Sequence, residues 1–168
     1  MNLETRLFAY GTLKQGSPVH AQLCRGVCSV IPAQLWGRLY ELPTGCPALR
    51  VPVGAVLAEA SMEPEADHVR LGELLHQPPS EFSREGWRPV SGQLITLADY
   101  RVAWPTLDAW EDAAPDRPVL FRRAIVRVER ANGVPVTAWT YIMPRLPERA
   151  RELATGIWPV PLSLAAGD

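Results

Sequence analysis

The chain has 168 residues, and its formal net charge of −1, from 17 basic and 18 acidic side chains, excludes a protein that binds nucleic acid through many phosphate contacts. This length predicts one domain, residues 1–168, whose core needs no disulfide framework, and 3 cysteines are too few to build one. The 17 prolines, about twice the average share, exclude a bundle of long helices.

No stretch of the sequence is long and apolar enough to predict a membrane-spanning helix. The first residues are unlike a signal peptide, because Glu4 precedes a short apolar run that soon reaches a glycine. We therefore expect a cytoplasmic protein that has neither a membrane nor a nucleic acid as a partner. The sequence makes no prediction of the oligomeric state.

The first part of the chain predicts strands separated by turns. Residues 5–10 form a short apolar run that ends at Gly11, which is typical of a buried strand followed by a loop. Residues 19–24 predict a short helical piece. Residues 27–42 predict two strand-like runs broken near Pro32, because proline cannot donate a hydrogen bond within a sheet.

Residues 59–88 predict a surface insertion within the same domain. Seven acidic residues outnumber three arginines in this segment. Ser61 is placed to cap a helix over about 64–76, with Pro64 in its first turn. The segment is too short to form a second domain.

The second half of the chain predicts further strands and short helices. The strands are expected at residues 90–97, 119–130 and 134–143. Asn132-Gly133 predicts a two-residue hairpin turn between the last two strands. Residues 96–114 predict a helix that Pro105 interrupts, and another short helix is expected near 147–154. Together these elements predict an α+β fold with a mixed, mostly antiparallel sheet that can close into a barrel.

Common nucleotide-binding and hydrolase motifs are missing from the sequence, including GxxxxGK[ST], GxGxxG, HExxH and GxSxG. Four residues are candidates for a zinc site: Cys24, Cys28, Cys46 and His20. Their spacing matches no usual zinc pattern, and buried apolar thiols are the simpler interpretation. We therefore expect no metal ion at these residues.

The run Tyr10-Gly11-Thr12-Leu13 is the first segment that points to chemistry. A glycine at the end of a strand lets the backbone approach a ligand closely. Consecutive amide groups after a strand can form a concave site for an anion such as a carboxylate. The alternative interpretation is a strand that simply ends in a turn.

Glu111 is the second candidate. Leu107 and Trp110 lie three residues apart and can pin the turn around Glu111 to the core. The neighbouring carboxylate of Asp112 and partial burial would both raise the pKa of Glu111 toward the neutral range that suits proton transfer. The alternative interpretation is an exposed acidic turn.

These two segments belong to a series of short motifs that resembles the gamma-glutamylcyclotransferase-like family. Phe8-Ala9-Tyr10-Gly11-Thr12-Leu13-Lys14-Gln15-Gly16 resembles the family's first strand and its Tyr-Gly-(Ser/Thr)-Leu loop. Leu107-Asp108-Ala109-Trp110-Glu111 resembles the element that carries the family's essential Glu. Five further pieces follow the family's order, at residues 37–40 (GRLY), 45–49 (GCPAL), 90–94 (VSGQL), 138–141 (AWTY) and 156–158 (GIW). The resemblance covers residues 6–158.

The resemblance implies a β-barrel fold and an enzyme that cyclises a γ-glutamyl group. The substrate's own α-amine attacks its γ-amide carbonyl, and 5-oxoproline and an amine are released. Glu111 is implied as the general acid/base, and the implied reaction needs no metal ion and no organic cofactor. The loop that begins at Tyr10 is implied to bind substrate, with the amides of Gly11, Thr12 and Leu13 holding the α-carboxylate or the oxyanion. The substrate is implied to be a small γ-glutamyl compound, closer to γ-glutamylamines or γ-glutamyl-acylated products than to glutathione.

Three features depart from the family's pattern. Asp112 stands where glycine is usual, Phe121 stands where tyrosine is common, and residues 59–88 are longer than compact members need. Glu85, followed by a glycine in that segment, is a rival to Glu111 but lacks the Leu-Asp frame before it. Three arginines are candidates to contact an anionic part of the substrate or are simply exposed on strands: Arg50, Arg122 and Arg123. The departures favour an alternative function, a non-catalytic binding or interaction protein that retains the fold and the pocket.

Overall fold

The computed structural model describes residues 2–78, 81–113, 115–116 and 120–159. The strands are β1 (Thr5–Ala9), β2 (Val27–Glu41), β3 (Pro47–Arg50), β4 (Val56–Glu59), β5 (Arg88–Leu97), β6 (Arg122–Arg130), β7 (Pro135–Ile142) and β8 (Arg151–Glu152). The helices are α1 (His20–Leu23), α2 (Pro64–Leu75) and α3 (Tyr100–Glu111), with a 3-10 turn at Val53–Ala55. None of the described helices is long and apolar enough to span a membrane.

Five strands form a mixed β-barrel in the order β2-β5-β1-β7-β6, and β6 pairs with β2 again to close it. Neighbouring strands are antiparallel except β1 and β7, which run parallel. Closure uses the pairs Ala33–Arg130 and Gln34–Glu129. The strands β3 and β8 pair with the second half of β2, and β4 pairs with β6. The predicted fold class is therefore confirmed.

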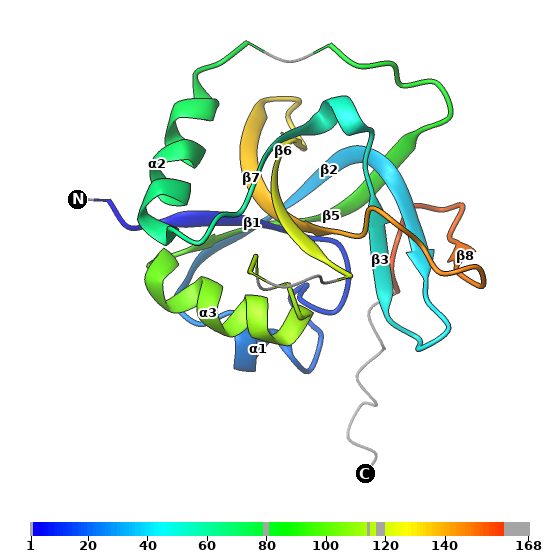
Figure 1. Cartoon of the computed structure of the whole chain (residues 1–168), viewed down its shortest axis with the longest axis horizontal. Helices are drawn as coiled ribbons and strands as arrows, with labels where there is room; N and C mark the ends of the chain where they lie inside the picture. The colour runs from blue at the N-terminus through cyan, green and yellow to red at the C-terminus, as the bar shows by residue number, and fades with distance from the viewer. Residues whose placement is uncertain (1, 79–80, 114, 117–119, 160–168) are drawn as a thin grey trace.

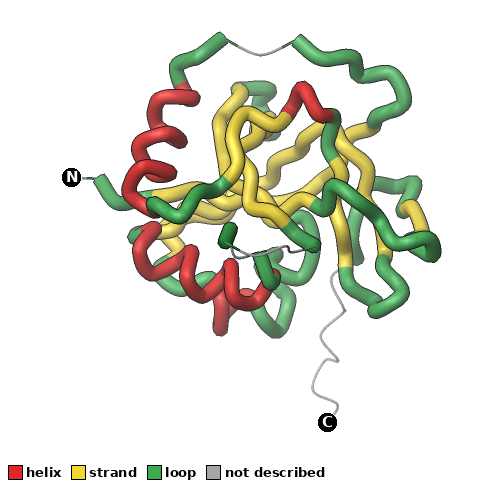
Figure 2. The backbone as a smooth tube through the Cα atoms, viewed as in Figure 1, coloured by secondary structure: helices red, strands yellow, loops and turns green. Residues whose placement is uncertain are grey.

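Alternate side chains of β1 and β5 point into two separate hydrophobic clusters. Phe8 and Leu94 lie in the cluster inside the barrel, whereas Leu7 and Ile95 lie in the cluster under the helices. Figure 1 and Figure 2 show the three α-helices gathered on one side of the strands, where they cover this second cluster. Both faces of β1 are buried over Leu7, Phe8 and Ala9, which form its continuous apolar run.

The strand β2 is one element of 15 residues, whereas the sequence predicts two runs broken near Pro32. Pro32 lies opposite Gln93 of β5, and the pairing of β2 with β6 begins only at Ala33. Among the described strands, β2 is therefore paired on one side only at Pro32, and a proline is tolerated at such a position of a sheet. The irregularity in β2 lies instead between Val27 and Ser29, where its register with β5 shifts.

Helix α3 is continuous through Pro105, where the sequence predicts a break. Pro105 is exposed, so water can bond the carbonyl of Arg101 that the proline leaves without a donor. The other face of the helix buries Ala103, Trp104 and Leu107. This packing outweighs the cost of proline in a helix interior, which is about 3 kcal/mol.

Helix α2 begins after Glu63, not at a Ser61 cap. The Asp67 carboxylate accepts hydrogen bonds from the Ser61 N–H at 3.0 Å and the Ser61 hydroxyl at 2.7 Å, so Ser61 bonds the first turn of the helix from outside. Leu71 and Leu74 are buried in the cluster under the helices. Helix α2 therefore packs onto the barrel at β7 and beside α3.

Two further segments differ from the sequence prediction. Between β6 and β7 only Gly133 has a positive φ (80°), whereas a two-residue type I′ turn needs two such residues. The Gly133 N–H bonds the Arg130 carbonyl, which makes a longer turn. Residues 147–154 form no helix: Ala150 closes a turn onto Pro147, and β8 follows. Pairing of β8 with β2 overrides the helical pattern of this segment.

Candidate active site

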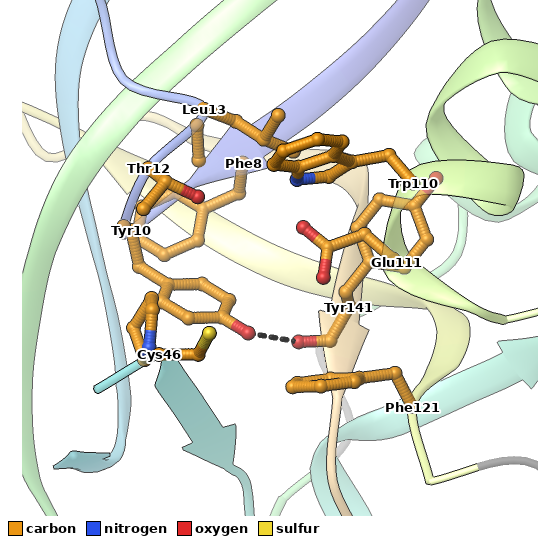
Figure 3. A pocket seen from close by; sticks show the side chains of 12 residues that line it. Phe8, Tyr10, Thr12, Leu13, Cys46, Trp110, Glu111, Phe121 and Tyr141 are labelled. Carbon is orange, nitrogen blue, oxygen red and sulfur yellow. Dashed lines mark hydrogen bonds between the residues drawn. The ribbon is translucent and has the colours of Figure 1, made fainter. Parts of the chain in front are cut away.

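A pocket of about 230 Å³ lies where the end of β1, the turn before β3 and the C-terminal end of α3 meet. It is lined by Phe8, Ala9, Tyr10, Gly11, Thr12, Leu13, Cys46, Pro47, Trp110, Glu111, Phe121 and Tyr141. The structure thus brings Glu111 together with the run Tyr10–Leu13, although the two segments are far apart in the sequence. Figure 3 shows the Glu111 carboxyl group pointing toward the loop.

Glu111 is the last residue of α3, and the helix ends there because Asp112 adopts the left-handed conformation (φ 49°, ψ 49°). The Asp112 N–H bonds the Ala109 carbonyl at 3.4 Å, and the Ala113 N–H bonds the Asp108 carbonyl at 2.9 Å. Aspartate is among the non-glycine residues that enter this region most readily. The glycine that is usual in the family at this position is therefore not needed for the turn.

The Glu111 carboxyl has a pKa raised to about 7, first by burial and then by the negative charge of Asp108. The sequence predicts Asp112 as the neighbour that raises this pKa, but Asp112 is exposed and the carboxylate that acts on Glu111 lies one helical turn earlier. Leu107 is a core anchor, whereas Trp110 is 52% exposed and lines the pocket instead of packing in the core. A carboxyl that titrates near neutral pH can both accept and donate a proton.

On the opposite side of the pocket, Gly11 is required by close packing. A Cβ atom on Gly11 would lie 2.3 Å from Cγ of Pro47, and the backbone of Gly11 has no positive φ. The glycine therefore allows the loop to touch the first residue of β3. Within the described part of the chain, the amides of residues 11–13 donate no hydrogen bond to another residue. These three donors are therefore unused among the described residues.

The loop is held in place from behind. The carbonyl of Leu13 lies 2.8 Å from Nδ1 of His20 and accepts a longer bond of 3.8 Å from the Cys24 thiol. The Lys14 ammonium donates to the Trp158 carbonyl at 2.7 Å. These contacts fix the backbone of the loop without using its amides.

The four candidates for a zinc site are not brought together, because only His20 and Cys24 lie near each other. His20 and Cys24 both contact the loop carbonyl, Cys28 is exposed, and Cys46 lies in the pocket wall. Among the described residues, no group of three or more His, Cys, Asp or Glu side chains is arranged to hold a metal ion. Cys28 and Cys46 are exposed, so the interpretation of buried thiols holds for Cys24 alone.

Tyr141 joins the two sides of the pocket, a role that the sequence does not predict. Its carbonyl accepts a hydrogen bond from the Tyr10 hydroxyl at 2.8 Å (Figure 3), and its own hydroxyl donates to Asp108 at 2.7 Å. Burial raises the pKa of both tyrosines well above the ordinary value, so both remain protonated donors near neutral pH. Strand alternation predicts that such a tyrosine is buried but not which polar groups it meets.

The three arginine candidates for contact with an anionic substrate do not line the pocket. Arg123 is buried and paired with Asp108, and Arg122 pairs with Glu59 at 3.1 Å. Arg50 lies in β3, away from the pocket lining. Glu111 is the only acidic or basic side chain among the described residues of the lining, and the rival Glu85 is exposed outside it.

Comparison with known proteins identifies a family and a fold. The family described as "Gamma-glutamyl cyclotransferase, AIG2-like" matches residues 7–88 and 55–160. The crystal structure of YkqA from Bacillus subtilis shares the fold, with a TM-score of 0.54 and 18% sequence identity over 92% of this chain and 39% of that one. This chain therefore spans less than half the length of YkqA. No curated protein matches significantly. That residues 59–88 are an insertion stays a prediction.

Proposed function

Because the chain belongs to the AIG2-like gamma-glutamyl cyclotransferase family, we propose that it is an enzyme that releases 5-oxoproline and an amine from a small γ-glutamyl compound. One observation carries the proposal. The carboxyl group of Glu111, with a pKa of about 7, faces the Tyr10–Leu13 loop across one pocket. All three cysteines are free thiols, which supports a reducing, cytoplasmic compartment.

The proposed reaction is intramolecular. The substrate's α-nitrogen bonds to its γ-carbonyl carbon, a five-membered ring closes, and the bond from that carbon to the leaving nitrogen breaks. Because nucleophile and carbonyl belong to one molecule, holding the glutamyl chain folded supplies much of the rate. The α-ammonium loses two protons, and both end on the leaving amine, which departs as an ammonium ion.

In this proposal, Glu111 carries one of those protons. Its carboxylate accepts a proton from the α-ammonium, and the resulting acid donates to the leaving nitrogen. The amides of residues 11–13 hold the α-carboxylate or the oxyanion of the tetrahedral intermediate. These steps use only groups of the chain and the substrate.

The experiment is a comparison of 5-oxoproline release by wild type and by Glu111→Gln. The substrates are γ-glutamyl amines, γ-glutamyl dipeptides and glutathione. The amide keeps the size of the side chain but cannot transfer a proton, so we expect a loss of about 10²–10⁴-fold. Glu85→Gln removes an exposed carboxylate outside the pocket and is the matched control, with unchanged turnover expected.

The other outcomes are equally informative. Turnover that survives in Glu111→Gln would keep the reaction but reject Glu111 as its acid/base. Binding of 5-oxoproline without turnover of any substrate would favour the alternative, a non-catalytic binding protein. The observation in favour of that alternative is Phe121, which lines the pocket without the hydroxyl group common in the family.

A further inference from the structure

A buried charged network lies behind Glu111, between helices α2 and α3 and the barrel. Arg123 of β6 is 3% exposed. Its guanidinium donates two hydrogen bonds to Asp108 of α3, at 2.8 and 3.1 Å, and lies 3.8 Å from the carboxylate of Asp67 of α2. The rings of Trp104 and Trp139 lie 4.5 and 4.4 Å from its central carbon. The Arg123 guanidinium is thus shared by two carboxylates and lies against two aromatic rings.

Holding the helices against the barrel does not require such a network. Moving an arginine and its partners out of water is costly, and well-packed apolar side chains of similar volume often stabilise a protein at least as well. The Nη1 atom of Arg123 is also buried without a hydrogen-bond partner among the described residues. A role in the chemistry of the site accounts for a network that packing alone does not need.

The network reaches the pocket through Asp108. This residue lies one helical turn before Glu111 on α3 and accepts the hydroxyl hydrogen bond of Tyr141. The carbonyl of Tyr141 in turn accepts the hydrogen bond of Tyr10, at the start of the loop. Arg123 is therefore connected both to the acid on one side of the pocket and to the loop on the other.

We propose that Arg123, shared between Asp67 and Asp108, is a positioning residue of this site: it holds the Asp108 carboxylate one helical turn from Glu111 and offsets part of its charge, and so sets the pH at which Glu111 exchanges its proton. This inference rests on the proposed function, in which Glu111 is the acid/base. It also couples α2 to the active site, although none of the family-like motifs includes that helix.

The groups that face Glu111 from other elements are the phenols of Tyr10 and Tyr141 and the thiol of Cys46. Burial raises the pKa of each phenol well above its ordinary value, so neither ionises in the range where Glu111 titrates. On its own helix, Asp108 is the charged group that raises the pKa of Glu111. A change of charge at Asp108, or at Arg123 and Asp67 next to it, should therefore change the pKa of Glu111.

The test is the pH profile of kcat/KM for 5-oxoproline release by Asp67→Asn. Asp67 does not line the pocket, and the swap keeps its size. With less negative charge around Arg123, the Glu111 proton should leave more easily, and the acidic limb of the profile should move to lower pH by about 0.3–1 unit. Asp108→Asn, which is nearer, should move it in the same direction by about 1–2 units.

Glu73→Gln is the matched control. It removes the same charge from the same helix, but Glu73 is 57% exposed, and we expect no shift of the limb. Unfolding curves for all three variants show whether each is folded. An acidic limb that stays in place, or moves to higher pH, in folded Asp67→Asn and Asp108→Asn would overturn the proposal.

A readout without substrate separates this inference from the proposed function. The carboxyl carbon of Glu111, labelled with ¹³C and titrated by NMR, reports its pKa directly. If wild type turns over no γ-glutamyl compound, the proposed function fails. The same three variants then test the network, because the NMR titration of Glu111 should still shift to lower pH in Asp67→Asn and Asp108→Asn and not in Glu73→Gln.

Discussion

The two sides of the pocket are held by different forces. On the loop side, Gly11 touches Pro47 with no room for a side chain, and the carbonyl of Leu13 is held by hydrogen bonds. On the helix side, the end of α3 rests on the ion pair of Asp108 and Arg123. Steric changes should therefore damage the loop side, and charge changes should alter the pH behaviour of the helix side.

The difference fits what the proposed function asks of each side. In that proposal the loop holds the substrate with its backbone amides, and packing and its carbonyl groups fix the loop without using those amides. In the same proposal the helix supplies a carboxyl group that titrates near neutral pH, which burial and a neighbouring charge of the same sign favour.

The largest expected effect is a loss of stability when a core side chain of α3 is truncated. Leu107 is fully buried, and Leu107→Ala should lower the free energy of unfolding by about 2–5 kcal/mol. Val102 lies on the same helix but is 53% exposed, so Val102→Ala should change the free energy of unfolding by less than about 0.5 kcal/mol. Urea unfolding followed by circular dichroism measures both. Equal losses in the two variants would show that α3 is not held by this contact.

The next effect is the pH dependence of stability that Glu111 introduces. Its pKa is about 7 in the folded chain against the ordinary value of 4.5, so between these values the folded state binds the proton more tightly than the unfolded state. The contribution of Glu111 to the free energy of unfolding is therefore fully present below pH 4.5. It is lost as the pH rises through about 7, which lowers the free energy of unfolding by on the order of 3 kcal/mol.

Urea unfolding of wild type and Glu111→Gln across this pH range measures that cost. The variant should gain stability relative to wild type as the pH rises, because its amide never ionises. Glu85→Gln, at an exposed position, should follow wild type throughout. A relative gain that grows toward low pH instead would contradict the direction of the pKa shift.

On the loop side, Gly11→Ala should cost about 1–3 kcal/mol of stability, because the new methyl group forces Pro47 and its turn to move. Turnover should fall as the pocket wall shifts, while the acidic limb of the pH profile stays in place. Gly72→Ala is the control: nothing lies near its added methyl group on α2, and it should gain up to about 1 kcal/mol. A displaced limb in Gly11→Ala would mean that the two sides are not independent.

The smallest effect concerns the end of α3. At φ 49° a β-branched residue is strained, and Asp112→Val should lose about 1–2 kcal/mol of stability. Asp112→Gly, which restores the usual family residue, should stay within about 1 kcal/mol of wild type. Thermal unfolding of the two variants shows which of them is more stable. A valine variant as stable as the glycine variant would show that the left-handed turn does not limit this helix end.

Much of the fold follows from local patterns. The apolar run of β1 predicts a strand buried on both faces, and the alternating segments predict the sheet. Where local preference and tertiary context disagree, the context decides. Pro32 lies in β2 at a point where one side is free, and Pro105 lies on the exposed face of a well-packed helix. Neither circumstance is visible from the residues nearby.

The sequence by itself determined the two segments of the candidate site, because a strand that ends in Tyr-Gly-Thr-Leu and a helix that ends in Glu are local features with their own motifs. Only the tertiary structure decided that Tyr141 joins them and that Arg123 is a buried partner of Asp108 and not an exposed strand arginine. These contacts link residues from different strands and helices. Which buried polar groups meet depends on how the barrel closes, and no spacing along the chain specifies that.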